Sequence, residues 1–126
     1  MPQGVVGDIL VRMAEQRQSP WKDEAEYMAA LTHERHMFAW CLLTVGNASG
    51  SEAQSRAELR YPYESATKPY RGIIFHDLAW HYAMSELFGL GYHKARPELG
   101  RPSDAYWAES KRFELLADNR NAPDGA

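Results

Sequence analysis

The chain has 126 residues, a formal net charge of −3 and a pI near 5.9. This length is enough for one domain with a modest core, and the mild acidity argues against a dedicated nucleic-acid binder. The sequence contains no apolar run of about 18 residues and no N-terminal secretory pattern, so we expect neither a membrane span nor a secretory signal. Cys41 is the one cysteine. An internal disulfide and a cysteine-cluster metal site are therefore excluded within this chain, and a cytoplasmic location is expected.

Residues 1–20 begin the chain with apolar side chains at helical spacing. The stripe within residues 4–17 consists of Val5, Val6, Ile9, Leu10 and Met13. This spacing predicts an amphipathic helix, which Pro20 ends. Because the segment is separable from the rest of the chain, we expect an extended N-terminal helical arm that docks on a partner.

A second helix is predicted from about Lys22 to Val45. Its apolar residues recur at three- and four-residue steps, and acidic residues occupy its first turns, as the helix dipole favours. The recurring residues are Tyr27, Leu31, Phe38, Leu42 and Val45. Gly46 and Gly50 lie where this helix should end.

The same helix carries His33, Glu34 and His36. Histidines at i and i+3 share a helix face and can bind one metal ion, with Glu24 or Glu26 as a further ligand. The spacing differs from that of the zinc-protease motif, which needs histidines at i and i+4. The alternative is that these histidines are solvated or lie at an interface.

The stretch from Ser51 to Gly89 is predicted to organise the rest of the chain. A short helix begins with Ser51 as its N-cap. A turn follows that is rich in tyrosine and in proline, which keeps it out of a helix. The turn contains Tyr61, Pro62, Tyr63, Pro69 and Tyr70. The next residues, about 71–89, are apolar on most of a helical surface, which predicts a long buried central helix.

Asp77, His81 and Ser85 are polar exceptions on this last helix, spaced so that they share one face. A catalytic triad is one interpretation. A triad needs nucleophile and base at bonding distance beside an oxyanion hole, which consecutive turns of one helix rarely supply. The alternative is an Asp–His hydrogen bond on the solvent face or at a subunit contact.

Glycine and proline interrupt residues 90–102, which predicts an irregular arm. The basic residues of the arm are His93, Lys94, Arg96 and Arg101. An anion site and a solvated linker are both compatible with that composition. A last helix is predicted with Ser103 as its N-cap, and residues 119–126 are expected to be a flexible tail.

Together these elements predict an all-α fold of four to five helices, with the helical domain over residues 21–118. No nucleophile–base motif, glycine-rich phosphate loop or metal-ligand cluster occurs at diagnostic spacing. The residues alone therefore favour an interaction module over an enzyme that is catalytic by itself.

Several short motifs between Trp21 and Leu99 occur in a characteristic order. An apolar helix, MAALTHERHMFAWCLLTVG, precedes SEAQSR, which ends at Arg56. Pro69-Tyr70-Arg71 follows, then the helix to Phe88-Gly89, and finally Pro97-Glu98-Leu99. In this order the chain resembles the helical N-terminal domain of the β subunit of nitrile hydratases and the related chain of thiocyanate hydrolase. The turn departs from the family, which usually has two adjacent tyrosines followed by Glu-Arg.

The resemblance implies a subunit that binds no metal itself. In the family, a Cys-x-x-Cys-Ser-Cys loop of the α subunit holds non-corrin cobalt(III) or non-haem iron(III), and two of its cysteines are oxidised. The β subunit closes the pocket and contributes arginines to the oxidised cysteine oxygens. Arg56 falls where the family places such an arginine, and the resemblance adds Tyr70 and Arg71 of the turn as further site residues.

The resemblance also implies partners. These are a nitrile hydratase-like α subunit and a separate subunit containing the barrel that follows this domain in the family. A small nitrile-type substrate would bind in the complex, with no nucleic acid or membrane involved. One alternative is a cobalt-delivering activator of such an enzyme, for which His33, His36 and His93 would matter more. Another is an unrelated helical protein-interaction domain.

Overall fold

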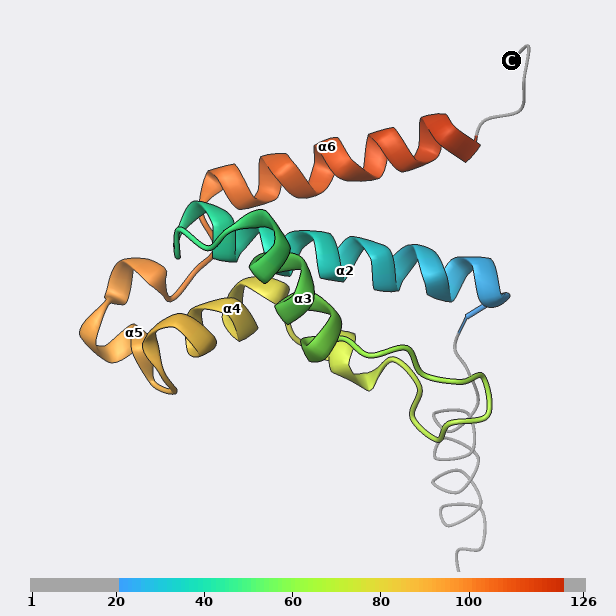
Figure 1. Ribbon diagram of the computed structural model, residues 1–126, viewed down its shortest axis with the longest axis horizontal. Coiled ribbons are helices and arrows are strands. Elements are labelled where there is room, and N and C mark those ends of the chain that lie inside the picture. The colour runs from blue at the N-terminus through green and yellow to red at the C-terminus, as the bar shows by residue number, and fades with distance from the viewer. Residues whose placement is uncertain (1–20, 122–126) are drawn as a thin grey trace, which may run out of the picture.

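The computed structural model describes residues 21–121, and side chains as far as residue 118 (Figure 1). The predicted arm over residues 1–20 and the last residues of the predicted tail, 122–126, lie outside the described residues. All regular elements of the described range are helical, which confirms the all-α fold. They are α2 (Glu24–Thr44), α3 (Gly50–Arg60), the 3-10 helix η1 (Ile73–His76), α4 (Ala79–Phe88), α5 (Tyr92–Ala95), the 3-10 helix η2 (Pro97–Leu99) and α6 (Asp104–Asn121).

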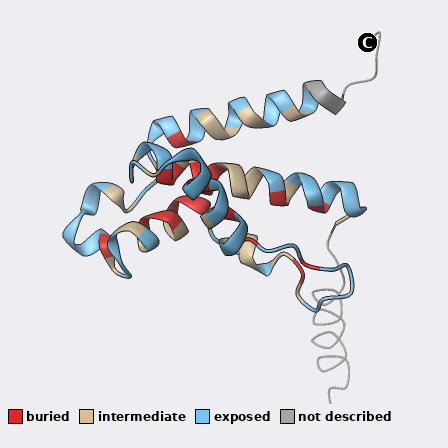
Figure 2. Ribbon diagram, viewed as in Figure 1, coloured by how far each residue is buried: buried red, intermediate tan, exposed pale blue. Residues whose placement is uncertain are grey.

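Helix α2 is the centre of the described fold. Asp23 begins it, since its carboxylate accepts a hydrogen bond of 2.9 Å from the Glu26 N–H group. The helix is 21 residues long, and α3, α4 and α6 all contact it. Its buried residues are Tyr27, Leu31, Met37, Phe38, Ala39, Cys41 and Leu42. Figure 2 shows that buried residues gather where α2, α3 and α4 meet, so the helix predicted near residues 22–45 supplies much of the core.

The predicted continuous helix over residues 71–89 is wrong. The chain forms η1, leaves helical geometry at Asp77 and starts again as α4. Asp77 is extended, and its carboxylate accepts a hydrogen bond from the Leu78 N–H group at 2.8 Å. Such a local side-chain bond competes with the helical hydrogen bonds. Ile73 before the break is exposed, whereas Met84 after it is buried. The long central helix is therefore α2.

Helix α3 crosses α2 on a face built of small residues (Figure 1). Ala53 and Ala57, one turn apart, are fully buried. Without large side chains between them, the two helices can pack closely. The N-cap is Ser49 rather than the predicted Ser51, because the Ser49 hydroxyl accepts a hydrogen bond from the Glu52 N–H group at 3.2 Å.

The rest of the described chain returns along α2. Helices α5 and η2 are short, as the glycines and prolines of residues 90–102 predict. Ser103 begins α6 as predicted, since its hydroxyl accepts a hydrogen bond from the Tyr106 N–H group at 3.2 Å. Helix α6 then runs beside α2 in the opposite direction (Figure 1) and continues to Asn121, past the expected start of the tail. None of the helices between residues 21 and 121 has the length and hydropathy needed to cross a bilayer.

Candidate functional site

Arg71 fastens the loop between α3 and η1 to α2. Its side chain is only 2% exposed, and its Nη2 atom lies 2.6 and 3.0 Å from the two carboxylate oxygens of Glu24. Its Nε atom donates to the Glu64 carbonyl at 2.9 Å, and its guanidinium carbon lies 3.5 Å from the centre of the Tyr27 ring. Charge-assisted hydrogen bonds and an aromatic face therefore hold the guanidinium inside the chain.

Glu64 completes this arrangement from within the loop. Its N–H group donates to the Tyr27 hydroxyl at 2.9 Å. Its carboxylate accepts a hydrogen bond from the Gly72 N–H group at 2.9 Å and lies 2.7 Å from the Lys68 Nζ atom. Glu64 is buried, and these partners offset the cost of removing its charge from water. The loop anchor, as we call it, consists of Glu24, Tyr27, Glu64 and Arg71.

Tyr63 extends the loop anchor towards solvent. Its hydroxyl donates a hydrogen bond to the Glu24 carboxylate. The Tyr63–Glu24 hydrogen bond is the main cause that lowers the pKa of the Glu24 carboxyl, and the hydrogen bond from Arg71 is the next. The Tyr63–Glu24 bond also raises the pKa of the Tyr63 hydroxyl. At neutral pH Glu24 is thus ionised and Tyr63 protonated, which is the pairing that the hydrogen bond requires.

Tyr70 shapes the loop through its backbone. Its φ of 59° lies in the left-handed region, which is uncommon for a bulky residue, and its carbonyl accepts a hydrogen bond from the Ile73 N–H group at 3.0 Å. Gly72 follows with φ 84°, and a Cβ atom there would lie 2.9 Å from the Trp21 ring. The Pro-Tyr-Arg turn of the sequence is therefore a backbone bend that delivers Arg71 to α2.

Arg56 lies in different surroundings, on α3. Its side chain is 42% exposed, and its Nε atom lies 3.7 Å from a carboxylate oxygen of Glu52, which is 54% exposed. This is a solvated contact between residues one helical turn apart, and such pairs are weak. No hydrogen bond or ion pair within the described residues joins Arg56 to Tyr70 or Arg71. The three predicted site residues therefore divide into two neighbours in the loop, the buried Arg71 and the partly buried Tyr70, and a separate arginine on α3.

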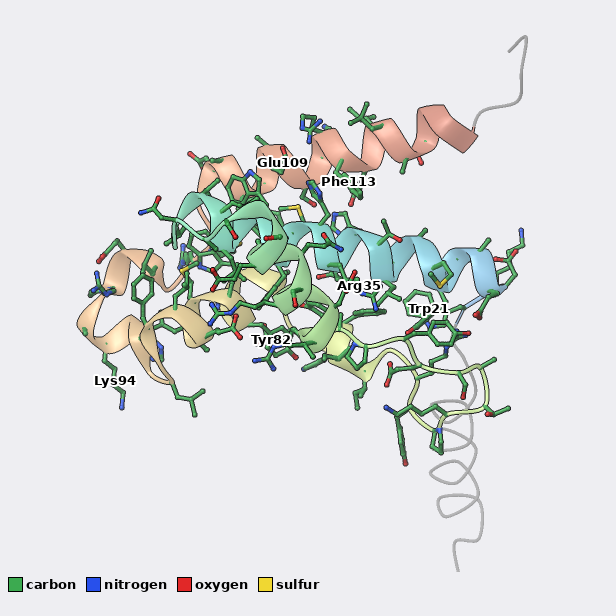
Figure 3. The ribbon with its side chains drawn as sticks, viewed as in Figure 1. Trp21, Arg35, Tyr82, Lys94, Glu109 and Phe113 are labelled. Atoms are coloured by element: carbon green, nitrogen blue, oxygen red, sulfur yellow. The ribbon has the colours of Figure 1, made fainter. Side chains whose placement is uncertain are left out.

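Arg60, one turn from Arg56, was missed as a candidate in the sequence. The two arginines line a shallow pocket of about 270 Å³ together with Leu59 and with Glu86 of α4. The Arg60 guanidinium lies 5.2 Å from the centre of the Tyr82 ring, which is labelled in Figure 3. The i, i+4 spacing of the two arginines was the signal that could have found this pair. We call Arg56, Leu59, Arg60 and Glu86 the α3 arginine face.

The histidines of α2 contact α6. The His36 Nε2 atom lies 2.6 Å from a carboxylate oxygen of Glu109, and the His36 ring stacks on Phe113 with 4.0 Å between ring centres. Figure 3 labels both of these α6 residues, on the side of α6 that faces α2. The His33 Nε2 atom lies 2.9 Å from the Ser110 hydroxyl. In the described part of the chain, no group of three His, Cys, Asp or Glu side chains is placed to hold a metal ion.

Asp77, His81 and Ser85 line a polar pocket of about 490 Å³ beside α5. The predicted Asp–His hydrogen bond is wrong. The His81 Nδ1 atom lies 2.6 Å from the Tyr92 hydroxyl, while the Asp77 carboxylate accepts a hydrogen bond from the Leu78 N–H group. Among the described residues no hydrogen bond joins Ser85 to His81, so the triad interpretation has no structural support.

The predicted anion site in the arm at residues 90–102 stays a prediction. Arg96 directs its guanidinium over the Phe88 ring, 4.4 Å from its centre, and His93 lines the polar pocket. The four basic residues of the arm share no hydrogen bond or ion pair within the described residues. The structure therefore brings together no cluster of them around a common point.

No family model, curated protein or solved structure matches this chain. The resemblance to nitrile hydratase β subunits therefore stays a prediction. The functional proposal below therefore rests on the geometry of the loop anchor and of the α3 arginine face.

Proposed function

We propose that this chain is the non-metal β-type subunit of a nitrile hydratase-like hydro-lyase, which acts on nitriles or on thiocyanate. In this proposal a partner α subunit holds the cobalt(III) or iron(III), a separate chain supplies the barrel, and the small substrate binds in the complex. The observation that carries the proposal is the state of Arg56, whose side chain is 42% exposed and has one long, solvated ion pair. Such a guanidinium remains available to a partner.

The chemistry of oxidised cysteines suits this arginine. Their oxygens carry negative charge, and a buried negative charge without a partner is costly. A guanidinium stays protonated and offers a planar fork of donors, so that it can bind two such oxygens at once. Arg56 would bind and orient the oxidised cysteines, while the metal of the α subunit supplies the reaction chemistry.

Arg71 has another role in this proposal. Its donors are bonded to Glu24 and Glu64, and freeing them for a partner would release the loop from α2. Arg71 and Tyr70 would therefore serve the assembled enzyme by fixing the shape of the loop that follows α3. They position the α3 arginine face and do not touch the metal site.

Exposed apolar side chains support a partner-dependent function. Leu59 is 79% exposed and lines the same pocket as Arg56. Leu90, between α4 and α5, is 95% exposed. Leu59 thus adds an apolar side chain to the surface that Arg56 would offer to a partner. A cytoplasmic assembly belongs to the same proposal, because the single cysteine of the sequence, Cys41, is a free thiol.

The test is the turnover of the reconstituted complex carrying Arg56→Lys. Lysine keeps the charge and loses the fork, so we expect turnover to fall at least about tenfold, or about 1.4 kcal/mol of transition-state stabilisation, while size-exclusion chromatography shows normal assembly. Arg112→Lys is the matched control, since Arg112 is similarly exposed and pairs with Glu109 within α6. Full activity of the assembled Arg56→Lys complex would remove Arg56 from the site.

The alternative, a cobalt-delivering activator, depends on histidines. His33 and His36 are engaged with α6, so no observation on the described residues favours that function. We expect the purified chain to retain no stoichiometric metal after extensive dialysis, as measured by elemental analysis. One tightly bound cobalt, iron or zinc ion per chain would favour the activator over the subunit.

A further inference from the structure

Helix α6 is held to α2 in different ways along its length. Near its start, Tyr106 is buried, and its ring lies edge-on to the rings of Trp40 and Trp80. Further along, Leu115 is exposed, and a groove of about 450 Å³ lies between the two helices beside Phe113. Because little apolar surface is buried there, the C-terminal half of α6 depends more on polar contacts, and such a segment opens locally more easily than the core.

His36 of α2 makes the shortest of these polar contacts. Its Nε2 atom lies 2.6 Å from a carboxylate oxygen of Glu109, and its ring stacks on the Phe113 ring with 9° between the ring planes. Its Nδ1 atom has no hydrogen-bond partner within the described residues, and the side chain is 30% exposed. A proton can therefore enter from solvent at Nδ1 while Nε2 keeps its hydrogen bond to Glu109.

The carboxylate of Glu109 remains charged in this pair. Arg112 donates two hydrogen bonds to it, of 2.7 and 2.6 Å, and these are the main cause that lowers the pKa of Glu109 to about 2. Arg112 is also a cation that opposes the protonation of His36, but its side chain is 55% exposed, so solvent screens that repulsion. Near neutral pH the charge state of the pair therefore depends on the imidazole.

His33 contributes less to the pH dependence of this attachment. The hydrogen bond to Glu34 is the largest cause that raises the pKa of His33. Glu34 belongs to α2 itself, so this bond does not require α6. The α6 partners of His33 are the Ser110 hydroxyl, 2.9 Å away, and the solvated carboxylate of Glu114, 3.7 Å away. The group that couples the attachment of α6 to pH is therefore His36.

We propose that His36 and Glu109 form a pH-dependent latch, which holds the C-terminal half of α6 on α2 when the imidazole is protonated and loosens when it is neutral. Histidine ordinarily changes its charge between about pH 5 and 8. A protonated imidazole forms a stronger hydrogen bond with a carboxylate than a neutral one does, and the stacked aromatic ring also attracts a cation. The neutral ring keeps one hydrogen bond and loses both of these attractions.

Opening of the latch would separate Phe113 from the His36 ring and widen the groove between α2 and α6. A proton that binds more tightly in the closed state favours that state as the pH falls, and its contribution is lost as the pH rises. The latch would thus couple pH to the apolar surface that the chain exposes. This inference does not depend on the proposed enzymatic function.

Hydrogen exchange of residues 109–118 tests the latch in the full chain. The rates are expressed as protection factors, so that the pH dependence of the chemical exchange step cancels. We expect the protection of these amides to be at least about threefold higher at pH 6 than at pH 8. The amides of residues 80–84 in α4 are the internal reference and should change less. Equal protection of residues 109–118 at the two pH values would overturn the proposal.

Two variants identify the groups responsible. His36→Gln keeps a donor for Glu109 and removes the titration, so the protection of residues 109–118 should no longer differ between pH 6 and pH 8. Glu109→Gln removes the charge, leaves the imidazole in place and should have the same effect. His76→Gln is the matched control, because His76 is exposed in η1, and it should keep the native difference. A pH dependence that survives in either latch variant would also overturn the proposal.

Discussion

The loop anchor and the α3 arginine face each contain an arginine that pairs with a glutamate, but the two arginines differ in burial and in how many of their donors are bonded within the chain. Arg71 is buried, donates to Glu24 and to the Glu64 carbonyl, and lies over the Tyr27 ring. The Arg56 side chain is partly exposed, and its Nε atom has one contact of 3.7 Å with the solvated carboxylate of Glu52. The two residues are of one type, so the surroundings decide their roles. An arginine whose donors are used inside the chain holds the fold, and one whose donors are free can serve a partner.

The largest expected difference between the two arginines is in the free energy of unfolding when each is replaced with alanine. Arg71→Ala removes the hydrogen bond to the buried Glu64 carbonyl and the cation–π contact with Tyr27. We expect the free energy of unfolding to fall by about 2 kcal/mol. Arg56→Ala removes only an exposed contact and should leave that free energy nearly unchanged. Chemical denaturation of both variants measures the difference, and equal losses would break the distinction between the two regions.

Glycine substitutions test the backbone of the loop and of α3, and we expect a somewhat smaller change in stability. Gly72→Ala forces an L side chain to a φ of +84° and brings its Cβ within 2.9 Å of the Trp21 ring, so we expect a loss of about 1–2 kcal/mol in thermal denaturation. Gly50 begins α3 with nothing within 4 Å of the added atom. Gly50→Ala is the control and should be neutral or slightly stabilising. A neutral Gly72→Ala would show that the loop does not need this bend.

The smallest expected effect is a difference in acid stability. Because the pKa of the Glu24 carboxyl is lowered in the folded chain from its ordinary 4.5, its contribution is present above pH 4.5 and is lost as the pH falls below that value. Arg71→Met removes one of the groups that lower this pKa, so the melting temperature should fall less between pH 5 and pH 3 than in the native chain. Arg56→Met should leave that slope unchanged, and identical slopes in all three proteins would contradict the assignment.

The periodicity of the sequence predicts the helices well where local signals decide them. The spacing from Tyr27 to Leu42 correctly predicts α2, and Ser103 correctly predicts the start of α6. The apolar pattern continues through Asp77, so it does not predict the break there. In the structure the Asp77 carboxylate accepts a hydrogen bond from the Leu78 N–H group where the helical geometry ends. The sequence pattern therefore predicts residues 71–89 as the central helix, whereas α2 has that place in the structure.

The role of Arg71 could not be predicted from its neighbours in the sequence. Its carboxylate partner, Glu24, lies 47 residues away, on α2. Such a contact depends on the whole fold, and no local pattern encodes it. By contrast, the pairing of Arg56 with Glu52 joins residues at i, i+4 spacing on one helix, which is a local relation that a sequence displays.

The most direct measurement of the central claim compares Arg56→Lys and Arg71→Lys in one reconstituted complex, scoring turnover per assembled complex together with the melting temperature of the isolated chain. We expect Arg56→Lys to lose at least about tenfold in turnover and to keep its melting temperature, because the guanidinium of Arg56 binds the partner. We expect Arg71→Lys to lower the melting temperature, because the guanidinium of Arg71 holds the loop anchor together. Native turnover by a correctly assembled Arg56→Lys complex would contradict the claim.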